Sequence, residues 1–237
     1  MICVFTGGES PEAATAKSFF MQNLNCEKDR KIRSVAADSG IETFCKYQSE
    51  LGIFKIESIL GDWDSIKDKS RLDDFPPSII ETHIVDKDYT DTELALEKAY
   101  GMKIDSDEKI VLVGAGGGSR IDHLIAVYDL FSTELKPDVW VAGGQFLYFL
   151  AENSKMQISN LKHSDTVSVL RTSKSRTEGR IESCGLEWES NLFRKTGVPS
   201  ISNRVADSSK NGNVELKAFD ADFVIALPPS ANVSFSL

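Results

Sequence analysis

Hydrophobic residues in the first part of the chain fall into short apolar runs separated by segments with helical spacing. The runs cover residues 1–6, 32–37, 56–60, 78–85, 109–113 and 138–142, and each is followed at once by a glycine or an aspartate. The segments 11–24 and 41–51 carry apolar residues at the spacing of one helix face. This alternation predicts an α/β domain with a mostly parallel, Rossmann-like sheet.

The pattern changes near residue 150. Short alternating runs with turn residues between them follow, at residues 166–171, 179–182, 214–218 and 223–226, and hardly any helical spacing remains. Such a pattern predicts an all-β domain, either a sandwich or a barrel. We therefore expect an α/β domain at residues 1–150 and an all-β domain at residues 151–237.

Composition narrows the class of protein. The 237 residues are 41% hydrophobic, which is enough for a globular core, and the net charge of −9 argues against nucleic acid as the main partner. No apolar run is long enough to span a bilayer, and the first residues lack the features of a signal peptide, so we expect a cytoplasmic protein. The four cysteines are far apart in the sequence, which indicates reduced thiols: Cys3, Cys26, Cys45 and Cys184.

Two aspartates, Asp62 and Asp64, follow the apolar run 56–60 with a tryptophan between them. Alternation continued into the turn would point both carboxylates the same way, beyond the carboxyl end of a strand, where open α/β sheets bind ligands. Carboxylates held this close suit a divalent cation with a phosphate-bearing substrate; the alternative is an ordinary polar turn. Asp38 follows the run 32–37 in a similar way, and would either cap the next helix or contact a ligand.

The acidic segment 86–93 precedes a predicted helix. Thr90 or Asp91 is suited to cap that helix, and Glu93 is placed to complete a capping box. The segment carries three aspartates, Asp86, Asp88 and Asp91, which is more than capping needs. The surplus fits a metal–phosphate site, in which Lys87 would supply a point charge for a phosphate; otherwise Lys87 is a solvated surface lysine.

A glycine-rich stretch follows the apolar run 109–113. Its backbone N–H groups are suited to wrap an anion, and the glycines concerned are Gly116, Gly117 and Gly118. Arg120 is able to fork onto phosphate oxygens, and Asp122 stands at the start of the next helix. The stretch matches neither a Walker A loop nor a dinucleotide-binding fingerprint.

Five motifs, taken in order, resemble those of the thiamin pyrophosphokinase family, whose members are also called thiamin diphosphokinases. They are GDWDS at 61–65, DKDYTDTE at 86–93, GGGSRIDH at 116–123, GLEW at 185–188 and SN at 202–203. AADSG at 36–40 is similar to the ADGG turn of that family, with Ser39 in place of a glycine. The resemblance covers nearly the whole chain.

The resemblance implies transfer of pyrophosphate from ATP to the hydroxyl of thiamine, giving thiamine diphosphate and AMP, with Mg²⁺ as the cofactor. It implies that the α/β domain binds ATP and the metal, and that the β-domain binds thiamine. It also implies a homodimer, in which the α/β domain of one subunit and the β-domain of the other close one active site.

The resemblance also assigns roles to residues. The implied catalytic set is Asp62, Asp64, Asp91, Arg120 and Asp122, and the implied metal ligands are Asp62, Asp64 and either Asp88 or Asp91. Asp122 would orient or deprotonate the thiamine hydroxyl, or else bind the metal. ATP would contact Asp38, Lys87, Thr90 and the glycines at 116–118.

On the thiamine side, Trp188 would stack on the pyrimidine ring, while Ser202 and Asn203 hydrogen-bond its edge. The alternatives are core packing for Trp188 and a turn for the other two residues. Two other functions stay open at this point. One is a regulatory module that binds ATP or thiamine diphosphate without turnover. The other is a glycosyltransferase, which the all-β tail disfavours.

Overall fold

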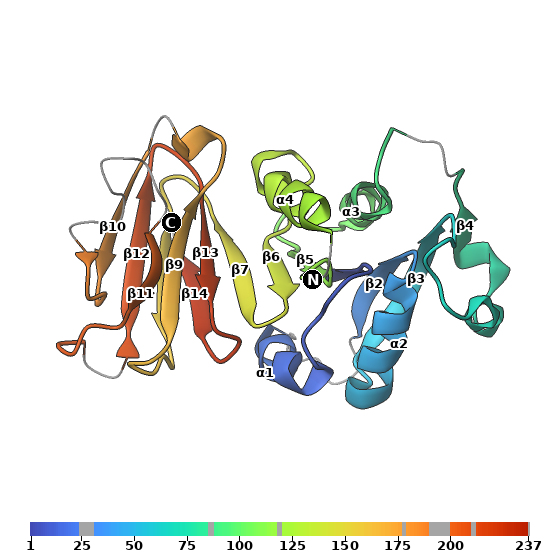
Figure 1. Cartoon of the computed structure of the whole chain (residues 1–237), viewed down its shortest axis with the longest axis horizontal. Helices are drawn as coiled ribbons and strands as arrows, with labels where there is room; N and C mark the ends of the chain where they lie inside the picture. Colours follow the sequence, from blue (N-terminus) through green and yellow to red (C-terminus); the bar gives the residue numbers. More distant parts are fainter. Residues whose placement is uncertain are drawn as a thin grey trace. The chain divides into compact units, whose positions relative to one another are not determined.

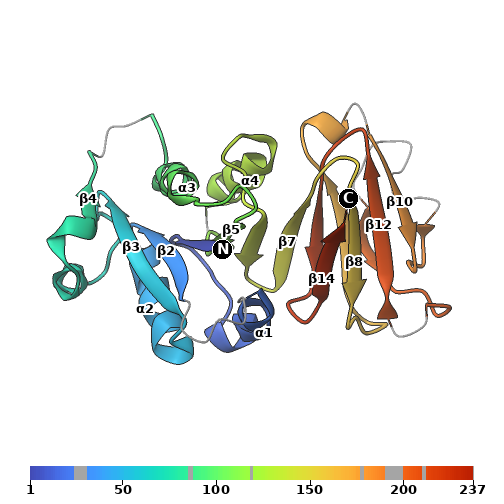
Figure 2. The same cartoon turned by 180° about the vertical axis from the view of Figure 1, so that it is seen from behind.

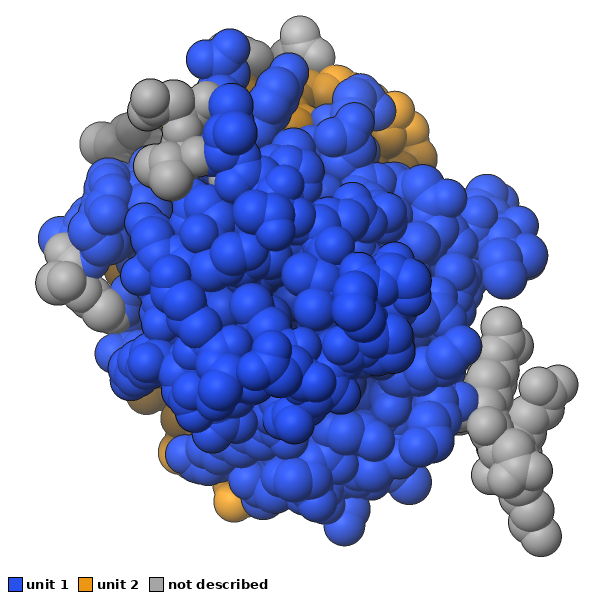
Figure 3. Space-filling view, turned by 90° about the vertical axis from the view of Figure 1, so that its right-hand side faces the viewer, with its two compact units in different colours: residues 1–130, 134–143 blue, residues 131–133, 144–237 orange. Residues whose placement is uncertain are grey.

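The structure is a computed structural model, and it describes residues 1–23, 31–84, 88–117, 120–176, 179–189, 200–209 and 212–236. The chain divides into two compact units, one of residues 1–130 and 134–143 and one of residues 131–133 and 144–237 (Figure 3). The boundary between the units lies at residues 143–144, a few residues before the expected boundary at residue 150. The reason is that the strand Gln145–Leu150 pairs with a strand of the second unit. Among the described residues, no helix is both long and apolar enough to cross a membrane.

The first unit is a parallel sheet with helices on both faces. Its strands are β1 (Ile2–Phe5), β2 (Ile32–Ala37), β3 (Phe54–Gly61), β4 (Ile80–Thr82), β5 (Ile110–Val113) and β6 (Val139–Ala142). They lie in the order β6-β5-β1-β2-β3-β4, and every neighbouring pair is parallel. Helices α1 (Ala13–Asn23) and α2 (Gly40–Leu51) cover one face, and α3 (Asp91–Met102) and α4 (Ile121–Asp129) cover the other (Figures 1 and 2). The predicted α/β fold is confirmed.

Buried aromatic rings fix α2 on the sheet. Phe5 of β1 meets Phe44, Tyr47 and Phe54 edge to face, with ring centroids 5.3 to 5.6 Å apart. The Tyr47 hydroxyl donates a hydrogen bond to the carbonyl oxygen of Pro11, 2.8 Å away. Edge-to-face pairs add to the burial of apolar surface. The packing therefore holds the turn between β2 and α2 in place.

Gly40, the first residue of α2, lies against the backbone of β1. A Cβ atom at this position would lie 2.2 Å from the carbonyl oxygen of Phe5. We expect Gly40→Ala to lower the free energy of unfolding by about 1 to 3 kcal/mol, because backbone atoms cannot move aside. Gly101→Ala in α3 is the control, since nothing lies within 4 Å of its added Cβ. Thermal unfolding measures both, and equal melting temperatures would contradict this packing.

The segment between β3 and β4 contains two short 3-10 helices, η1 (Lys69–Asp74) and η2 (Pro77–Ile79). Two further short 3-10 helices are η3 (Leu130–Ser132) and η4 (Lys174–Arg176). Short helices of this kind serve as connections, and do not alter the predicted fold class.

The second unit is built from strands. They are β7 (Gln145–Leu150), β8 (Lys155–Ser159), β9 (Thr166–Arg171), β10 (Arg180–Cys184), β11 (Ser200–Arg204), β12 (Val214–Phe219), β13 (Phe223–Leu227) and β14 (Asn232–Ser236). They form two antiparallel groups, β11-β9-β13-β7 and β10-β12-β8-β14. Each group contributes buried side chains, such as Val167 and Val169 from one and Met156 and Leu216 from the other. The predicted all-β region is therefore a two-sheet sandwich.

Candidate active site

The sequence motifs of the first unit gather at one edge of its sheet. Because the strands are parallel, the turns after their carboxyl ends meet at this edge. The Asp38 amide, after β2, donates to the carbonyl oxygen of Leu60 in β3 at 2.8 Å, and the Ala115 amide, after β5, donates to that of Gly7 at 2.7 Å. The hydroxyls of Thr6 and Thr92 lie 2.9 Å apart and bring the first turn of α3 to the same edge.

Asp38, Asp62 and Asp64 form a compact group of carboxylates. Each offers one oxygen, and these oxygens lie within 4.8 Å of one another. Asp62 Oδ1 accepts a hydrogen bond from the Asp64 amide at 3.2 Å, which orders the turn. Repulsion by the Asp62 carboxylate raises the pKa of Asp64, followed in size by desolvation and by the charge of Asp38. A group of this kind suits a cation.

Trp63, between the two aspartates, anchors this turn. Its backbone has φ of 66°, its side chain is buried, and its Nε1 donates to Thr82 Oγ1 at 3.1 Å. A positive φ is uncommon for a large residue, so the surrounding packing must hold it there. The buried indole therefore fixes where the flanking carboxylates lie.

The Asp38 side chain lies with those of Asp62 and Asp64 and does not cap α2. The N-cap residue of α2 is Ser39, and its side chain makes no capping hydrogen bond. Asp38 Oδ2 accepts a hydrogen bond from Ser65 Oγ, which also lies 2.9 Å from Ser39 Oγ. Asp38 Oδ1 is buried and has no hydrogen-bond partner among the described residues. Sequence reasoning did not find Ser65, although it ends the GDWDS motif.

The capping box predicted at the start of α3 is present. Thr90 Oγ1 accepts from the Glu93 amide at 3.2 Å, and Glu93 Oε2 accepts from the Thr90 amide at 2.8 Å. Asp88 and Asp91 do not belong to the carboxylate group described above, so their assignment as metal ligands stays a prediction. Lys87 and Asp86 lie outside the described residues.

The glycine-rich loop after β5 pairs with the loop after β1. The Glu9 amide donates to the carbonyl oxygen of Gly116 at 2.7 Å, and the Gly116 amide donates back to that of Glu9 at 3.0 Å. The Gly116 amide is therefore engaged by the chain itself, which the sequence did not indicate. A Cβ on Gly117, whose φ is 59°, would lie 2.1 Å from Glu9 Oε2. Gly118 lies outside the described residues.

Arg120 and Asp122, which have separate predicted roles, bind each other in this structure. Arg120 Nη2 donates to Asp122 Oδ2 at 2.6 Å and Nε donates to Oδ1 at 3.0 Å, both at the exposed start of α4. The hydrogen bonds and charge of Arg120 lower the pKa of Asp122 to about 2. Asp122 is thus a carboxylate at neutral pH, and a weak base while Arg120 holds it.

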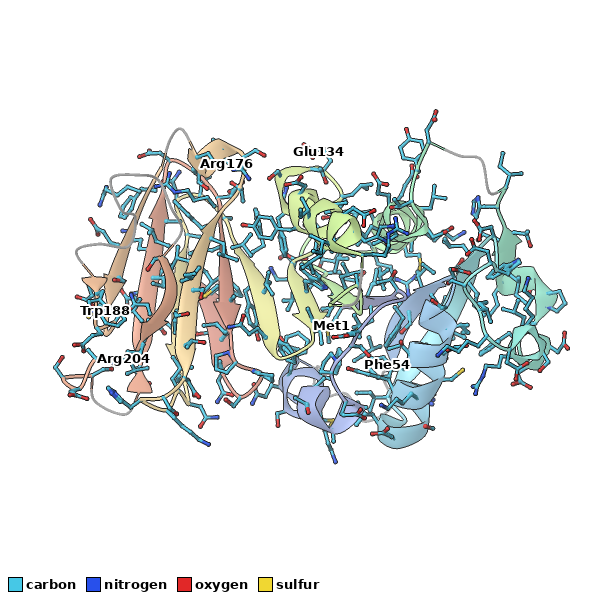
Figure 4. The ribbon with its side chains drawn as sticks, in the orientation of Figure 1. Met1, Phe54, Glu134, Arg176, Trp188 and Arg204 are labelled. Carbon is cyan, nitrogen blue, oxygen red and sulfur yellow. The ribbon has the colours of Figure 1, made fainter. Side chains whose placement is uncertain are left out.

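The second unit brings the GLEW and SN motifs together. Trp188 is 48% exposed, so core packing is the wrong interpretation of this residue. Ser202 and Asn203 lie in β11, so a turn is wrong as well. Ser202 is exposed, with φ of 57°, where the pairing with β9 shifts register. The Arg204 guanidinium lies 5.1 Å from the centre of the Trp188 ring, and both are labelled in Figure 4.

The chain matches the sequence model of a known protein family, and its fold is similar to solved structures. Residues 26–141 match the model of the thiamin pyrophosphokinase catalytic domain. Thiamine pyrophosphokinase from Bacillus subtilis is 17% identical with a TM-score of 0.66, and the match covers 96% of this chain and 98% of that one. The enzyme from Geobacillus thermodenitrificans is 20% identical with a TM-score of 0.61, covering 96% and 97%.

A third structure, thiamin pyrophosphokinase from Candida albicans, is 15% identical with a TM-score of 0.65, covering 96% of this chain and 89% of that one. At these identities the structural likeness establishes the fold alone, and the catalytic domain is identified by the sequence model over residues 26–141. No curated protein sequence matches the chain. Residues 26–141 therefore carry a thiamin pyrophosphokinase catalytic domain, which identifies the chain as an enzyme.

Proposed function

We propose that this enzyme transfers pyrophosphate from ATP to the hydroxyl of thiamine and releases thiamine diphosphate and AMP. The observation that carries the proposal is the group of Asp38, Asp62 and Asp64 oxygens within 4.8 Å of one another, beyond the carboxyl ends of parallel strands. Phosphoryl and pyrophosphoryl transfer depends on neutralising and positioning a polyphosphate, and an edge that holds a cation serves that purpose.

The carboxylate group fits Mg²⁺. All its donors are oxygens, which Mg²⁺ prefers, and the buried Asp38 Oδ1 has no hydrogen-bond partner among the described residues. A cation would also relieve the repulsion that raises the pKa of Asp64. We assign Asp62 and Asp64 as ligands, with Asp38 as a further candidate beside Asp88 and Asp91. When bound, the metal supplies positive charge to the polyphosphate of ATP.

Arg120 and Asp122 would exchange partners when substrates bind. Arg120 turns its guanidinium to phosphate oxygens, for which its fork geometry is suited. Asp122 then loses the charge that holds its pKa at about 2, and becomes a better acceptor for the proton of the thiamine hydroxyl. The hydroxyl oxygen attacks the β-phosphorus of ATP, the bond from that phosphorus to the α–β bridging oxygen breaks, and AMP leaves.

On the thiamine side, the exposed ring of Trp188 offers a stacking surface for a flat heteroaromatic ring. The exposed Ser202 is suited to hydrogen-bond the edge of that ring. Thr90, Lys87 and the glycines at 117–118 are proposed to contact ATP, by the resemblance of their motifs to those of the family.

We also propose that the enzyme is a cytoplasmic homodimer. Each active site would be formed by the α/β unit of one subunit and the β unit of the other. An exposed apolar face on α4 supports this, because Ile121, Leu124 and Ile125 follow helical spacing and are exposed in the single chain. The face begins beside Asp122, so a second copy that covers it would lie next to the proposed site.

Mass analysis of the products from ATP, Mg²⁺ and thiamine tests this function. We expect equal amounts of thiamine diphosphate and AMP, and no product when EDTA removes the metal. Thiamine monophosphate with ADP would instead indicate transfer of a single phosphoryl group. Binding of both substrates without any product would reject the proposed reaction.

A further inference from the structure

Asn203 occupies an unusual place for a residue expected to touch a substrate. It is 1% exposed, whereas Ile201, Ser202 and Arg204 around it in β11 are exposed. The register shift in the pairing of β11 with β9, together with the positive φ of Ser202, accompanies this inward orientation. The side chain therefore lies inside the second unit, away from solvent.

The side-chain amide of Asn203 makes three hydrogen bonds, and all of them go to neighbouring backbone. Its Oδ1 accepts from the Arg204 amide at 2.9 Å and from the Trp188 amide at 3.3 Å. Its Nδ2 donates to the carbonyl oxygen of Trp188 at 3.4 Å. Both polar backbone groups of Trp188 are thus held by one side chain, in the way that a partner strand would hold them.

These bonds extend a short backbone ladder. The Glu187 amide donates to the carbonyl oxygen of Arg204 at 2.9 Å, and the Ala206 amide donates to that of Gly185 at 2.9 Å. Leu186 and Val205 form an antiparallel β-bridge between these two hydrogen bonds. The ladder stops before Trp188, and the Asn203 side chain continues it by one residue. The half-exposed indole depends on this backbone for its position.

We propose that Asn203 is a positioning residue that fixes Trp188 for stacking, and that it does not contact thiamine. The proposal deepens the function proposed above and rests on it. It explains why an amide is needed, since Trp188 presents one donor and one acceptor and asparagine matches both. Aspartate would keep the acceptors, lose the donor and bury a charge. Alanine would lose all three hydrogen bonds.

A double-mutant cycle separates positioning from direct contact. Trp188→Ala and Asn203→Ala are each expected to raise the KM for thiamine about 3- to 10-fold and to leave the KM for ATP unchanged. If Asn203 acts only through Trp188, the double variant matches Trp188→Ala. Fold-changes that multiply in the double variant would overturn the proposal. Asn203→Asp replaces Asn203→Ala in the cycle if the alanine variant does not fold.

An NMR measurement tests the positioning without turnover. The indole N–H signal of Trp188, assigned with Trp188→Phe, is expected to shift or broaden in Asn203→Asp. The matched control is Asn160→Asp, because Asn160 also donates its Nδ2 to a backbone carbonyl, that of Ser230, at 2.8 Å. An unchanged signal in Asn203→Asp would overturn the positioning role. If the wild-type enzyme makes no thiamine diphosphate, the proposed reaction fails, while this spectrum still decides the role of Asn203.

Discussion

Replacing Asp62 or Asp64 by asparagine is expected to reduce turnover by about 10³-fold or more, because each change removes a charged metal ligand. The melting temperature without Mg²⁺ should hardly change. An asparagine at position 62 would keep the Oδ1 that accepts the Asp64 amide, and Asp64 is exposed, so the turn survives in both variants. Addition of Mg²⁺ should raise the melting temperature of the wild-type enzyme and of neither variant.

Asp73→Asn is the matched control, since Asp73 is an exposed aspartate of the nearby η1 and the change removes the same charge. It should keep normal turnover. Asp38→Asn and Asp91→Asn, measured in the same way, decide which further carboxylate binds the metal. Near-normal turnover in both Asp62→Asn and Asp64→Asn would reject the metal site.

Mixing Asp62→Asn subunits with Trp188→Ala subunits is expected to create intact sites equal to about a quarter of the wild-type number, so that activity at low thiamine exceeds that of the same two variants assayed without subunit exchange. With equal amounts and free exchange, half of the dimers are mixed, and each mixed dimer holds one site with neither change. The recovery follows only if Asp62 and Trp188 of one site come from different subunits.

A mixture of Asp62→Asn with Asp64→Asn provides the control, because both residues belong to the same unit and no intact site can form. Subunit exchange is checked with two different affinity tags. Confirmed exchange without recovery in the first mixture would show that each site lies within one subunit. A single-chain mass in solution would reject the dimer itself.

Local signals in the sequence were enough to predict most of the helices and strands of the first unit. Parallel strands buried on both faces read as continuous apolar runs, as in β5 (Ile110–Val113), so their places could be predicted. The capping box of Thr90 and Glu93 also depends on residues three positions apart. Structure that depends on a single short stretch of residues could therefore be predicted from the sequence.

Contacts between distant segments could not be predicted in this way. Ser202 and Asn203 are typical turn residues, yet they lie in β11 where its pairing with β9 shifts register. Asn203 hydrogen-bonds Trp188 from the opposite side of the ladder. Asp38 has the sequence position of a helix cap, but its hydrogen bond goes to Ser65, which only the packing of β2 beside β3 brings near. No local propensity encodes such pairs.

The place of β1 in its sheet has a consequence for how the chain folds as it is made. β1 pairs with β2 on one side and with β5 on the other, where Ile2 lies opposite Ile110. The first pairing closes a short loop, whereas the second waits until residues 110–113 have left the ribosome. Until then one edge of the apolar β1 lacks its partner strand, and during this stage of synthesis that edge is open to pairing with other chains.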